Sequence, residues 1–414
     1  MSQRVVVVGA GLGGLRAAEQ LRAADFAGEV IVVGEEQHLP YNRPPLSKNG
    51  LAGQLAHEAV AFRRKSSVDD VDWRLGESVV AADLRNRTVA LSNGTDLGYD
   101  GLVAATGARP RRLPLDAPLA WRHVVRTLDD ATRLHVDLGP GRQVVVIGSG
   151  FIGCEVAATA SLLGCEVSVV DPMPVPLQRP LGIEVGSELR RRHEQHGVRF
   201  HLGRTVARLD GRHGGGGGPE WLVLDDGTEL SATVVVEAVG SLPNVEWLAG
   251  NRLDLSDGVL CDGGLRPLCP DGPVRTAVAI GDIARFPNPM FDEVPRRVEH
   301  WNFPTETAKR AAGVLAADLA AEADHGAPRS DPLEALLPFT PMPAFWSDQY
   351  DIRLQSFGLP GLADDVRVLE GHLSGECAVG YYRGEVLVGV VLLGLGARYG
   401  HYRDLVANTR AASA

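Results

Sequence analysis

Two glycine-rich stretches of the chain have the spacing needed to hold phosphate groups. The pattern G-x-G-x-x-G begins at Gly9 and again at Gly148, 139 residues later, and each copy follows a run of β-branched residues. In such a pattern the first glycine makes a tight turn, the second lets the backbone approach a diphosphate, and the third lets helix and strand pack closely. The diphosphate then contacts free N–H groups at a helix N-terminus. Two copies predict two dinucleotide sites.

An acidic residue follows each glycine pattern at the end of the next predicted strand. Glu35 lies 21 residues beyond Gly14, where a carboxylate can accept the ribose hydroxyls of an adenosine. Asp171 occupies the matching place in the second copy, and the chain has no cation after it until Arg179. A carboxylate there would repel a 2′-phosphate, so the sequence favours NADH over NADPH. The alternative for Glu35 is an exposed loop acid.

Other polar residues lie where they could hold the rest of a cofactor. Two prolines stiffen the loop from Tyr41 to Lys48, so that Arg43 and Lys48 project from a rigid backbone toward a phosphate or a flavin edge. A plain surface loop is the alternative. Asp282 ends the apolar strand predicted over 277–280, where it can accept a hydrogen bond from a ribityl hydroxyl.

The elements that position these residues are predicted to alternate between strand and helix. In the first unit, a strand over about 4–8 precedes a helix over 12–24 and a strand over 30–33. In the second, strands over 143–147 and 166–170 flank a helix ending near Leu163. Residues 77–108 predict a small meander, and an Ala-rich helix is expected from Pro304 to about Ala323. The positive end of that helix would stabilise negative charge on a reduced flavin.

Composition limits the class of protein. Apolar residues make up 44% and charged residues 22%, as in a globular protein, and the net charge of -11 argues against general nucleic-acid binding. The five cysteines lack any metal-type spacing, and no metal site is expected. No signal peptide or membrane-length apolar run is evident. The sequence predicts a soluble, cytoplasmic protein with unpaired thiols and no membrane association.

Two stretches, one rich in glycine and one polar, are predicted to be loops that connect other elements. Gly214 to Gly218 predicts a flexible hairpin tip, and Asp324 to Pro332 predicts a linker. The residues after this linker predict a small α+β domain.

Taken together, these motifs resemble the ferredoxin reductase component of oxygenase systems, flavoproteins like putidaredoxin reductase and biphenyl dioxygenase reductase. The resemblance covers about residues 4–400. Its most specific parts are the segments Arg43–Lys48, Gly148–Glu155, Gly281-Asp282, Glu299–Trp301 and Phe345–Gln349. It implies a glutathione-reductase-like α/β fold with two Rossmann-type domains and a small α+β C-terminal domain. The implied boundaries are 1–114 and 242–323 for the FAD-binding domain, 115–241 for the NAD-binding domain, and 324–414 for the interface domain.

The resemblance also implies roles for individual residues. Lys48 and Glu155 resemble the family's ion pair beside the flavin N5, and Trp301 resembles its aromatic residue on the side of the flavin that faces the iron–sulfur partner. Trp346 would join Trp301 from the C-terminal domain. These three residues, Lys48, Glu155 and Trp301, are the catalytic candidates. The candidates for binding FAD and NADH are Gly9, Gly11, Leu12, Gly13, Gly14, Glu35, Arg43, Lys48, Ala105, Thr106, Gly107, Arg126, Asp282, Glu299, His300, Trp301, Gly148, Gly150, Phe151, Ile152, Gly153, Asp171 and Gly240.

The implied activity is electron transfer from NADH through FAD to a [2Fe–2S] ferredoxin, bound transiently, which feeds a cytochrome P450 or a Rieske-type oxygenase. The cofactor supplies the hard chemistry. The protein is expected to be a monomer or a homodimer. An acidic ferredoxin would need cations near the flavin, and the candidates are Arg63, Arg64, Lys65, Arg109, Arg111, Arg112, Arg296 and Arg297.

Other functions on the same fold stay open at this point. An NADH oxidase, or a peroxide or disulfide reductase, is one alternative; a disulfide reductase needs a redox cysteine pair early in the chain, whereas the first cysteine is Cys154. A flavoprotein like apoptosis-inducing factor is another, and a reductase for a dedicated biosynthetic monooxygenase is a third. One departure from the family is the segment Asn302–Pro304, where an Asn-Ala pair is usual.

Overall fold

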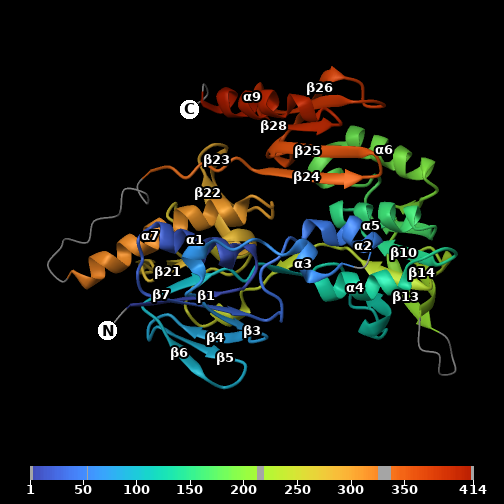
Figure 1. Ribbon diagram of the computed structural model, residues 1–414. Helices are drawn as coiled ribbons and strands as arrows, with labels where there is room; N and C mark the ends of the chain where they lie inside the picture. The colour runs from blue at the N-terminus through green and yellow to red at the C-terminus, as the bar shows by residue number, and fades with distance from the viewer. Residues whose placement is uncertain (1–2, 54, 212–218, 325–336, 412–414) are drawn as a thin grey trace. The chain divides into compact units, whose positions relative to one another are not determined.

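The computed structural model describes residues 3–53, 55–211, 219–324 and 337–411, which form two compact units (Figure 1). Unit 1 comprises Met1–Asn42, Ala61–Arg109 and Pro243–Pro343. Unit 2 comprises Arg43–Val60, Pro110–Leu242 and Ala344–Ala414. The predicted hairpin tip at Gly214–Gly218, and the predicted linker apart from Asp324, lie outside the described residues.

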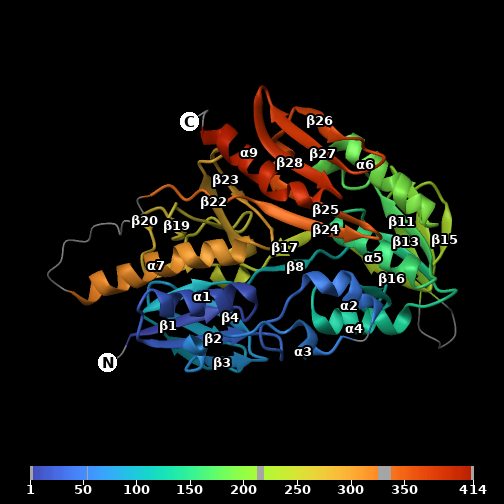
Figure 2. The ribbon, with the colours of Figure 1, turned by 45° about the horizontal axis from the view of Figure 1, so that its top comes forward.

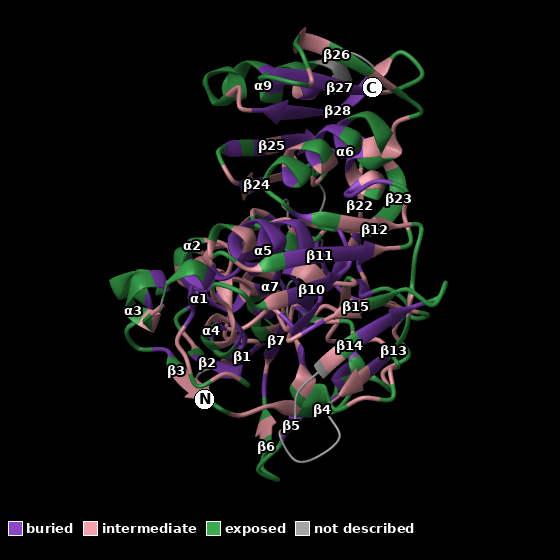
Figure 3. Cartoon of the chain, turned by 90° about the vertical axis from the view of Figure 1, so that its right-hand side faces the viewer, coloured by how far each residue is buried: buried purple, intermediate pink, exposed green. Residues whose placement is uncertain are grey.

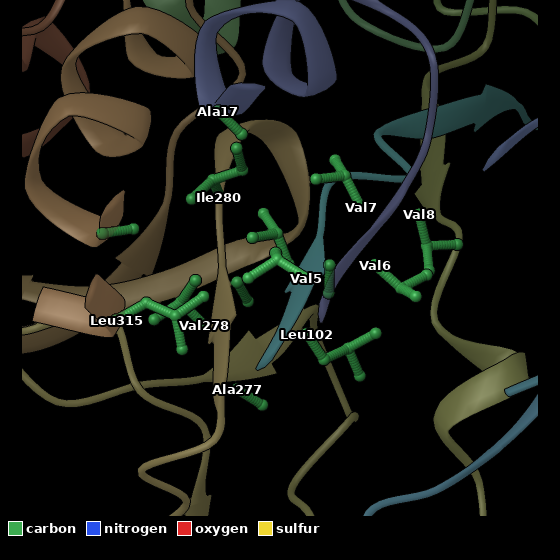
Figure 4. Close-up of a cluster of buried hydrophobic side chains, with 14 of the residues drawn as sticks. Val5, Val6, Val7, Val8, Ala17, Leu102, Ala277, Val278, Ile280 and Leu315 are labelled. Carbon is green, nitrogen blue, oxygen red and sulfur yellow. The ribbon is translucent and has the colours of Figure 1, made fainter. Parts of the chain in front are cut away.

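Unit 1 is built on a five-stranded parallel sheet that carries the first glycine pattern. Its strand order is β21-β7-β1-β2-β3, where the strands are Ala277–Ala279 (β21), Gly101–Ala104 (β7), Arg4–Val8 (β1), Glu29–Gly34 (β2) and Asp72–Leu75 (β3). The residues Val5 to Val8 are buried on both faces, as expected for a central parallel strand. Figure 4 shows these valines packed with Leu102, Val278 and Leu315 in the core of unit 1.

Two helices of unit 1 pack against each other beside this sheet. They are α1 (Leu12–Ala23), which starts at the glycine pattern, and α7 (Phe303–Ala323), which comes much later in the sequence (Figure 1). The meander predicted over 77–108 is confirmed only in part: β4 (Val79–Asp83), β5 (Thr88–Leu91) and β6 (Asp96–Gly98) form an antiparallel sheet, whereas β7 belongs to the parallel sheet. The remaining elements of unit 1 are η2 (Ser66–Val68), η4 (Glu246–Leu248), β18 (Val259–Leu260), β19 (Leu268–Cys269), β20 (Gly272–Pro273), η5 (Gly281–Ile283), β22 (Ala284–Asn288) and β23 (Asp292–Arg297).

Unit 2 contains a second parallel sheet of the same design. Its order is β12-β11-β10-β16-β9, with strands Arg199–Leu202 (β12), Glu166–Asp171 (β11), Gln143–Ile147 (β10), Val234–Glu237 (β16) and Arg122–His123 (β9). The second glycine pattern joins β10 to helix α5 (Phe151–Leu162), which is largely buried (Figure 3). Helices α4 (Leu128–Asp137) and α6 (Gln178–Gln195) complete this part of the unit.

The C-terminal part of unit 2 is an antiparallel sheet with a covering helix. The strand order is β24-β25-β28-β27-β26, and helix α9 packs along β28 and β25 (Figure 2). The bounds are Ala344–Gln349 (β24), Ile352–Gly358 (β25), Asp365–Gly371 (β26), Cys377–Arg383 (β27), Val386–Leu393 (β28) and Tyr399–Ala411 (α9). The other elements are η1 (Pro44–Ser47), α2 (Asn49–Ala52), α3 (His57–Val60), η3 (Leu119–Trp121), β13 (Val206–Gly211), β14 (Pro219–Leu224), β15 (Glu229–Ser231), η6 (Pro360–Leu362) and η7 (Gly396–Arg398), and β8 (Ala108–Pro110) and β17 (Ser241–Pro243) lie where the chain passes between the units.

The predicted class of fold is confirmed: two parallel sheets with helices, followed by a small α+β region. The four domain boundaries remain predictions. The segment 43–60, expected within the first FAD-binding part, groups instead with the residues of unit 2. None of the helices in the described ranges has the length and apolar character required to cross a membrane.

Candidate cofactor sites

The first glycine pattern forms a tight turn between β1 and α1. Gly9 has a φ of +115°, and a Cβ there would lie 2.3 Å from the Ala105 carbonyl oxygen. A Cβ on Gly14 would lie 2.0 Å from the Gly9 carbonyl oxygen. Both positions therefore require glycine, the first for its backbone conformation and the second for close packing. Ala105, Thr106 and Gly107, predicted to line the cofactor, follow β7 directly, and the backbone of Ala105 and Thr106 lies against this turn.

The second pattern repeats this geometry between β10 and α5. Gly148 has a φ of +103°, and its Cβ would lie 2.3 Å from the Ala238 carbonyl oxygen; a Cβ on Gly153 would lie 2.0 Å from the Gly148 carbonyl oxygen. Gly150 differs. Its φ is -72°, and an added Cβ would meet no atom of the described residues within 4 Å. Nothing in the fold requires glycine at this position, so open space above Gly150 fits a ligand that approaches the backbone.

The two helix starts that follow these turns fit a bound diphosphate. Neither α1 nor α5 has a side-chain cap at its N-terminus, and neither has an acidic residue in its first turn. The first N–H groups of a helix have no partner within the helix. An anion could therefore accept hydrogen bonds from the N–H groups at these helix starts, as predicted for the diphosphate of a dinucleotide. The N–H groups belong to Leu12 and Gly13 of α1 and to Phe151 and Ile152 of α5.

The two predicted ribose acids lie in different surroundings. The Glu35 side chain is exposed just after β2, and its carboxylate has no hydrogen-bond partner among the described residues. The Asp171 carboxylate accepts backbone N–H groups from Ser149, at 2.6 Å, and from Met173, at 2.8 Å. Asp171 thus holds the second glycine turn in place. A carboxylate has about four lone-pair positions, which leaves room for ribose hydroxyls as well.

The turn around Asp282 is fixed by α7. Gly281 has a φ of +67° and its N–H donates to Thr307 Oγ1 at 2.9 Å, which ties η5 to the first turns of α7. The Asp282 carbonyl accepts from Arg297. Thr106 Oγ1 donates to the Asn244 carbonyl at 2.6 Å, which links the end of β7 to residue 244 within the same unit.

The predicted aromatic residue of unit 1 is accessible. Trp301 is 39% exposed, and its Nε1 donates to Asn42 Oδ1 at 3.1 Å. Its neighbour Glu299 pairs with Arg297, and desolvation lowers the pKa of His300 to about 4. At neutral pH His300 is therefore uncharged. The departure at Asn302–Pro304 lies at the start of α7, where the Asn302 amide donates to the Met342 carbonyl.

In unit 2 the predicted pair of Lys48 and Glu155 is present. Lys48 Nζ lies 2.8 Å from Glu155 Oε2, and the Glu155 side chain is only 3% exposed. Glu155 is the one charged residue of α5, so its burial requires partners. Ser47 Oγ supplies a second, donating to Oε2 at 2.5 Å. The Ser47 carbonyl in turn accepts from Thr159, which fixes this loop on α5.

Arg43 and Arg126 also meet in unit 2. A guanidinium N–H of Arg43 donates to the Arg126 carbonyl at 2.6 Å. The following residue, Thr127, caps α4 with its side chain accepting from the Asp130 N–H, so Arg126 stands just before a well-defined helix start. Gly240, the last candidate, has a φ of +102° beyond β16, and a Cβ there would meet nothing within 4 Å.

One residue at this site, Ser347, was not predicted from the sequence. Ser347 Oγ donates to Glu155 Oε1 at 2.6 Å, and Ser347 is fully buried. It belongs to the aromatic motif Phe345–Gln349, in which only Trp346 was expected to act. The guanidinium carbon of Arg353 lies 5.9 Å from the centroid of the Trp346 ring, and the role of Trp346 beside Trp301 stays a prediction. The signal for Ser347 was present as a small polar residue between aromatic ones, but no pattern of spacing relates it to Glu155.

The cysteines do not form a redox pair. All five lie within the described ranges and all are free. Burial raises the pKa values of the Cys154 and Cys261 thiols, so neither is a thiolate at neutral pH. In the described part of the chain, no cluster of three or more candidate ligands could hold a metal ion.

Most of the predicted docking cations are paired within their own units. Arg109 contacts Glu246, Arg112 contacts Glu237, Arg296 contacts Asp292, and Arg297 contacts Asp257 and Glu299. Arg63 and Arg111 are exposed and have no ion-pair partner among the residues described. Arg64 lies over the Trp73 ring, and Lys65 lies 3.9 Å from Glu19.

Comparison with known proteins gives a consistent result along the whole chain. The pyridine nucleotide-disulphide oxidoreductase family matches residues 3–303, and the reductase C-terminal family matches residues 344–414. The ferredoxin–NAD(+) reductase component of the anthranilate 1,2-dioxygenase system from Burkholderia cepacia is 36% identical over 408 residues, which cover 97% of this chain and 93% of that protein. Rhodocoxin reductase from Rhodococcus erythropolis is 34% identical, with 93% and 85% covered.

Solved structures show the same similarity. The covalent complex of putidaredoxin reductase with putidaredoxin contains a chain that matches with a TM-score of 0.86 at 29% identity, and 98% of this chain and 93% of that chain are covered.

Proposed function

The chain belongs to the pyridine nucleotide-disulphide oxidoreductase family, and from this premise we propose that it is an NADH-dependent ferredoxin reductase containing FAD. Members of the family use FAD and NAD(H). The observation that carries the proposal is the ion pair of Lys48 with Glu155, a buried carboxylate on the helix of the second glycine pattern, in a chain whose cysteines are all free. The partner is a [2Fe–2S] ferredoxin that feeds a Rieske-type oxygenase or a cytochrome P450.

The residues of unit 1 fit FAD. The tight turn at Gly9–Gly14 and the uncapped start of α1 suit its diphosphate, and Glu35 offers the ribose a carboxylate with no partner among the described residues. Asp282, beside the start of α7, is the proposed partner of the ribityl chain. When bound, FAD accepts a hydride from NADH and releases electrons singly to an iron–sulfur partner.

The residues of unit 2 fit NADH. Gly150 leaves space at the start of α5 for the diphosphate, and Asp171 offers a carboxylate where NADPH would carry a phosphate. We infer a preference for NADH on that ground.

Lys48 and Glu155 form a fixed pair of opposite charges. Two contacts fix the position of Lys48 Nζ: the ion pair with Glu155, and a hydrogen bond that Nζ donates to the Pro44 carbonyl at 3.1 Å. A cation held in this way can stabilise negative charge that develops next to it, and Glu155 prevents it from being an unpaired buried charge. We propose that the pair orients the nicotinamide and responds to the charge change on reduction.

Docking of an acidic ferredoxin would use cations that are free to contact it. Arg63 satisfies this condition in unit 1, whereas Arg297 is committed to Asp257 and Glu299. An Arg63→Glu variant should lower ferredoxin-dependent turnover several-fold at low salt while ferricyanide reduction is unchanged. An Arg85→Glu variant, at an exposed turn of the meander, is the control for net charge. Equal losses with both acceptors would contradict a docking role for Arg63.

The five unpaired cysteines support a reducing compartment, and we propose the cytoplasm. The function itself is tested by NADH-dependent reduction of cytochrome c with and without an added [2Fe–2S] ferredoxin, with hydrogen peroxide followed in parallel. Strong stimulation by ferredoxin with little peroxide is expected. Rapid peroxide formation without stimulation by several ferredoxins would favour an NADH oxidase instead.

A further inference from the structure

Strand β24 of the C-terminal sheet packs beside α5, the helix that carries Glu155. Alternate residues of a strand point to the same face, so Phe345, Ser347 and Gln349 share one side of β24. The Phe345 ring packs on the Phe151 ring, with centroids 4.7 Å apart, at the start of α5. Four residues further along α5, Ser347 meets Glu155. One face of the C-terminal sheet is therefore built onto the helix of the second glycine pattern.

Hydrogen bonds continue from Ser347 away from Glu155. Gln349 Nε2 donates to Ser347 Oγ at 3.1 Å, and Gln349 Oε1 lies 2.9 Å from His193 Nε2. Tyr350 Oη lies 3.2 Å from His193 Nδ1. Burial lowers the pKa of His193 to about 4, so its imidazole is neutral at pH 7. Since an amide oxygen only accepts, His193 Nε2 donates and Nδ1 accepts from Tyr350.

In this series of hydrogen bonds, every donor points toward Glu155. The order is Tyr350 to His193, then Gln349, Ser347 and finally the carboxylate. Hydrogen bonds aligned in this way polarise and strengthen one another. The amide of Gln349 interrupts any transfer of protons, because its nitrogen and oxygen have separate donor and acceptor roles. This series of hydrogen bonds therefore orients Glu155 and does not conduct protons to it.

The two carboxylate oxygens of Glu155 consequently have different hydrogen-bond and ion-pair partners. Oε2 contacts Ser47 and Lys48, which come from the loop before α2, and Oε1 contacts Ser347 from the C-terminal sheet. Loss of Ser347 would leave Oε1 without its donor and free the carboxylate to turn about its last side-chain bond. The direction in which Glu155 faces Lys48 would then no longer be fixed.

We propose that Ser347 is a positioning residue for reduction by NADH, which acts by holding Glu155 in the orientation that pairs with Lys48. The C-terminal segment thereby takes part in the step that uses NADH, besides any part in contacting a ferredoxin. This inference rests on the proposed function, in which Lys48 and Glu155 lie beside the flavin.

The first test is the rate of flavin reduction by NADH in a Ser347→Ala variant, measured by rapid mixing. We expect a roughly tenfold slower limiting rate, equivalent to one hydrogen bond to a charged group, and an apparent Kd for NADH within about twofold of wild type. Ser356→Ala is the matched control, because Ser356 is equally buried, lies on the neighbouring strand β25, and its hydroxyl has no hydrogen-bond partner among the described residues. The control should leave the rate unchanged.

A double-mutant cycle shows whether Ser347 acts through Glu155. In a Glu155→Gln background, adding Ser347→Ala should slow reduction by less than about twofold. A tenfold loss in that background as well would overturn the proposal, since Ser347 would then act by another route. Ser347→Thr keeps the hydroxyl and should recover most of the rate.

A readout independent of turnover is the infrared carboxylate band of Glu155, isolated as the difference between wild type and Glu155→Gln without NADH. The band should shift in Ser347→Ala and stay in place in Ser356→Ala. A shifted band in a protein that fails to reduce ferredoxin would contradict the proposed function while supporting the positioning of Glu155. An unshifted band would contradict the positioning itself.

Discussion

Among single residues, the proposed use of NADH depends on a buried charge with several partners. Glu155 could be expected to matter from the sequence, because it is the only charged residue in an otherwise apolar helix. Its pairing with Lys48, 107 positions away in the sequence, was implied only by resemblance to a known family. The contact with Ser347 depends on how the C-terminal sheet packs on α5, and no local pattern encodes that. The importance of Glu155 was therefore predictable from the sequence, whereas its contact with Ser347 could be found only in the tertiary structure.

Removal of either charge should slow the step that uses NADH. In Lys48→Ala or Glu155→Ala, flavin reduction should be about 10- to 100-fold slower, while FAD stays bound because the first glycine turn lies elsewhere in the chain. Stopped-flow absorbance of the flavin gives the rate, and the flavin-to-protein absorbance ratio gives FAD content. Traces that match wild type would remove both residues from the mechanism.

Asp171 is expected to set the preference for NADH. In a variant with Asp171→Gly and Pro172→Arg, the ratio of kcat/KM for NADPH to that for NADH should rise by at least about tenfold, because a repulsive carboxylate is exchanged for a cation. The same variant should be less stable, since the N–H groups of Ser149 and Met173 lose their acceptor. An unaltered ratio would leave Asp171 as an anchor of the glycine turn only.

At the scale of elements, the sequence specified the strand–turn–helix units closely. The predicted helix over 12–24 is observed as Leu12–Ala23, and the helix expected from Pro304 is observed as Phe303–Ala323. These predictions succeeded because buried β-branched runs and glycine turns are local signals. The segment 43–60 shows the limit: the sequence predicted a rigid loop from Tyr41 to Lys48, but the contacts of this segment with α5 and α4 follow from long-range packing.

Substitutions at two glycines of the second pattern should distinguish an effect on stability from an effect on NAD⁺ binding. Gly150→Ala should change stability by less than about 1 kcal/mol, because its Cβ meets open space, yet weaken binding of NAD⁺ about tenfold by blocking the diphosphate. Gly153→Ala should cost about 2 kcal/mol or more, because its Cβ would lie 2.0 Å from the Gly148 carbonyl oxygen.

Thermal unfolding and calorimetric titration with NAD⁺ measure the two effects. Should Gly150→Ala lose as much stability as Gly153→Ala, the open space above Gly150 would not reflect a ligand site.

At the scale of the whole molecule, the histidines make stability depend on pH in one direction. The pKa values of His123, His193, His201 and His300 are all lowered, in each case mainly by desolvation. A lowered histidine pKa means that the unfolded chain binds more protons, so stability is full above about pH 6.5 and is lost as the pH falls toward 4. Carboxylates with lowered pKa values, such as Asp254 at about 2, lose their contribution only at lower pH.

The free energy of unfolding should therefore fall between pH 7 and pH 4.5, with His193 alone contributing on the order of 3 kcal/mol across its range. Urea unfolding at several pH values measures this, and a His193→Gln variant should show a shallower dependence. Stability that stays constant or rises on acidification over this range would contradict the neutral, buried state of His193.

The proposed electron transfer to ferredoxin is best tested by the yield of electrons from NADH. Enzyme loaded with FAD would be mixed without oxygen with a limiting amount of NADH and then with oxidised [2Fe–2S] ferredoxin, and both absorbances would be followed. We expect rapid bleaching of the flavin by NADH, and then about two ferredoxin clusters reduced for each NADH oxidised. A flavin that NADH reduces but that passes no electrons to any [2Fe–2S] ferredoxin would contradict it.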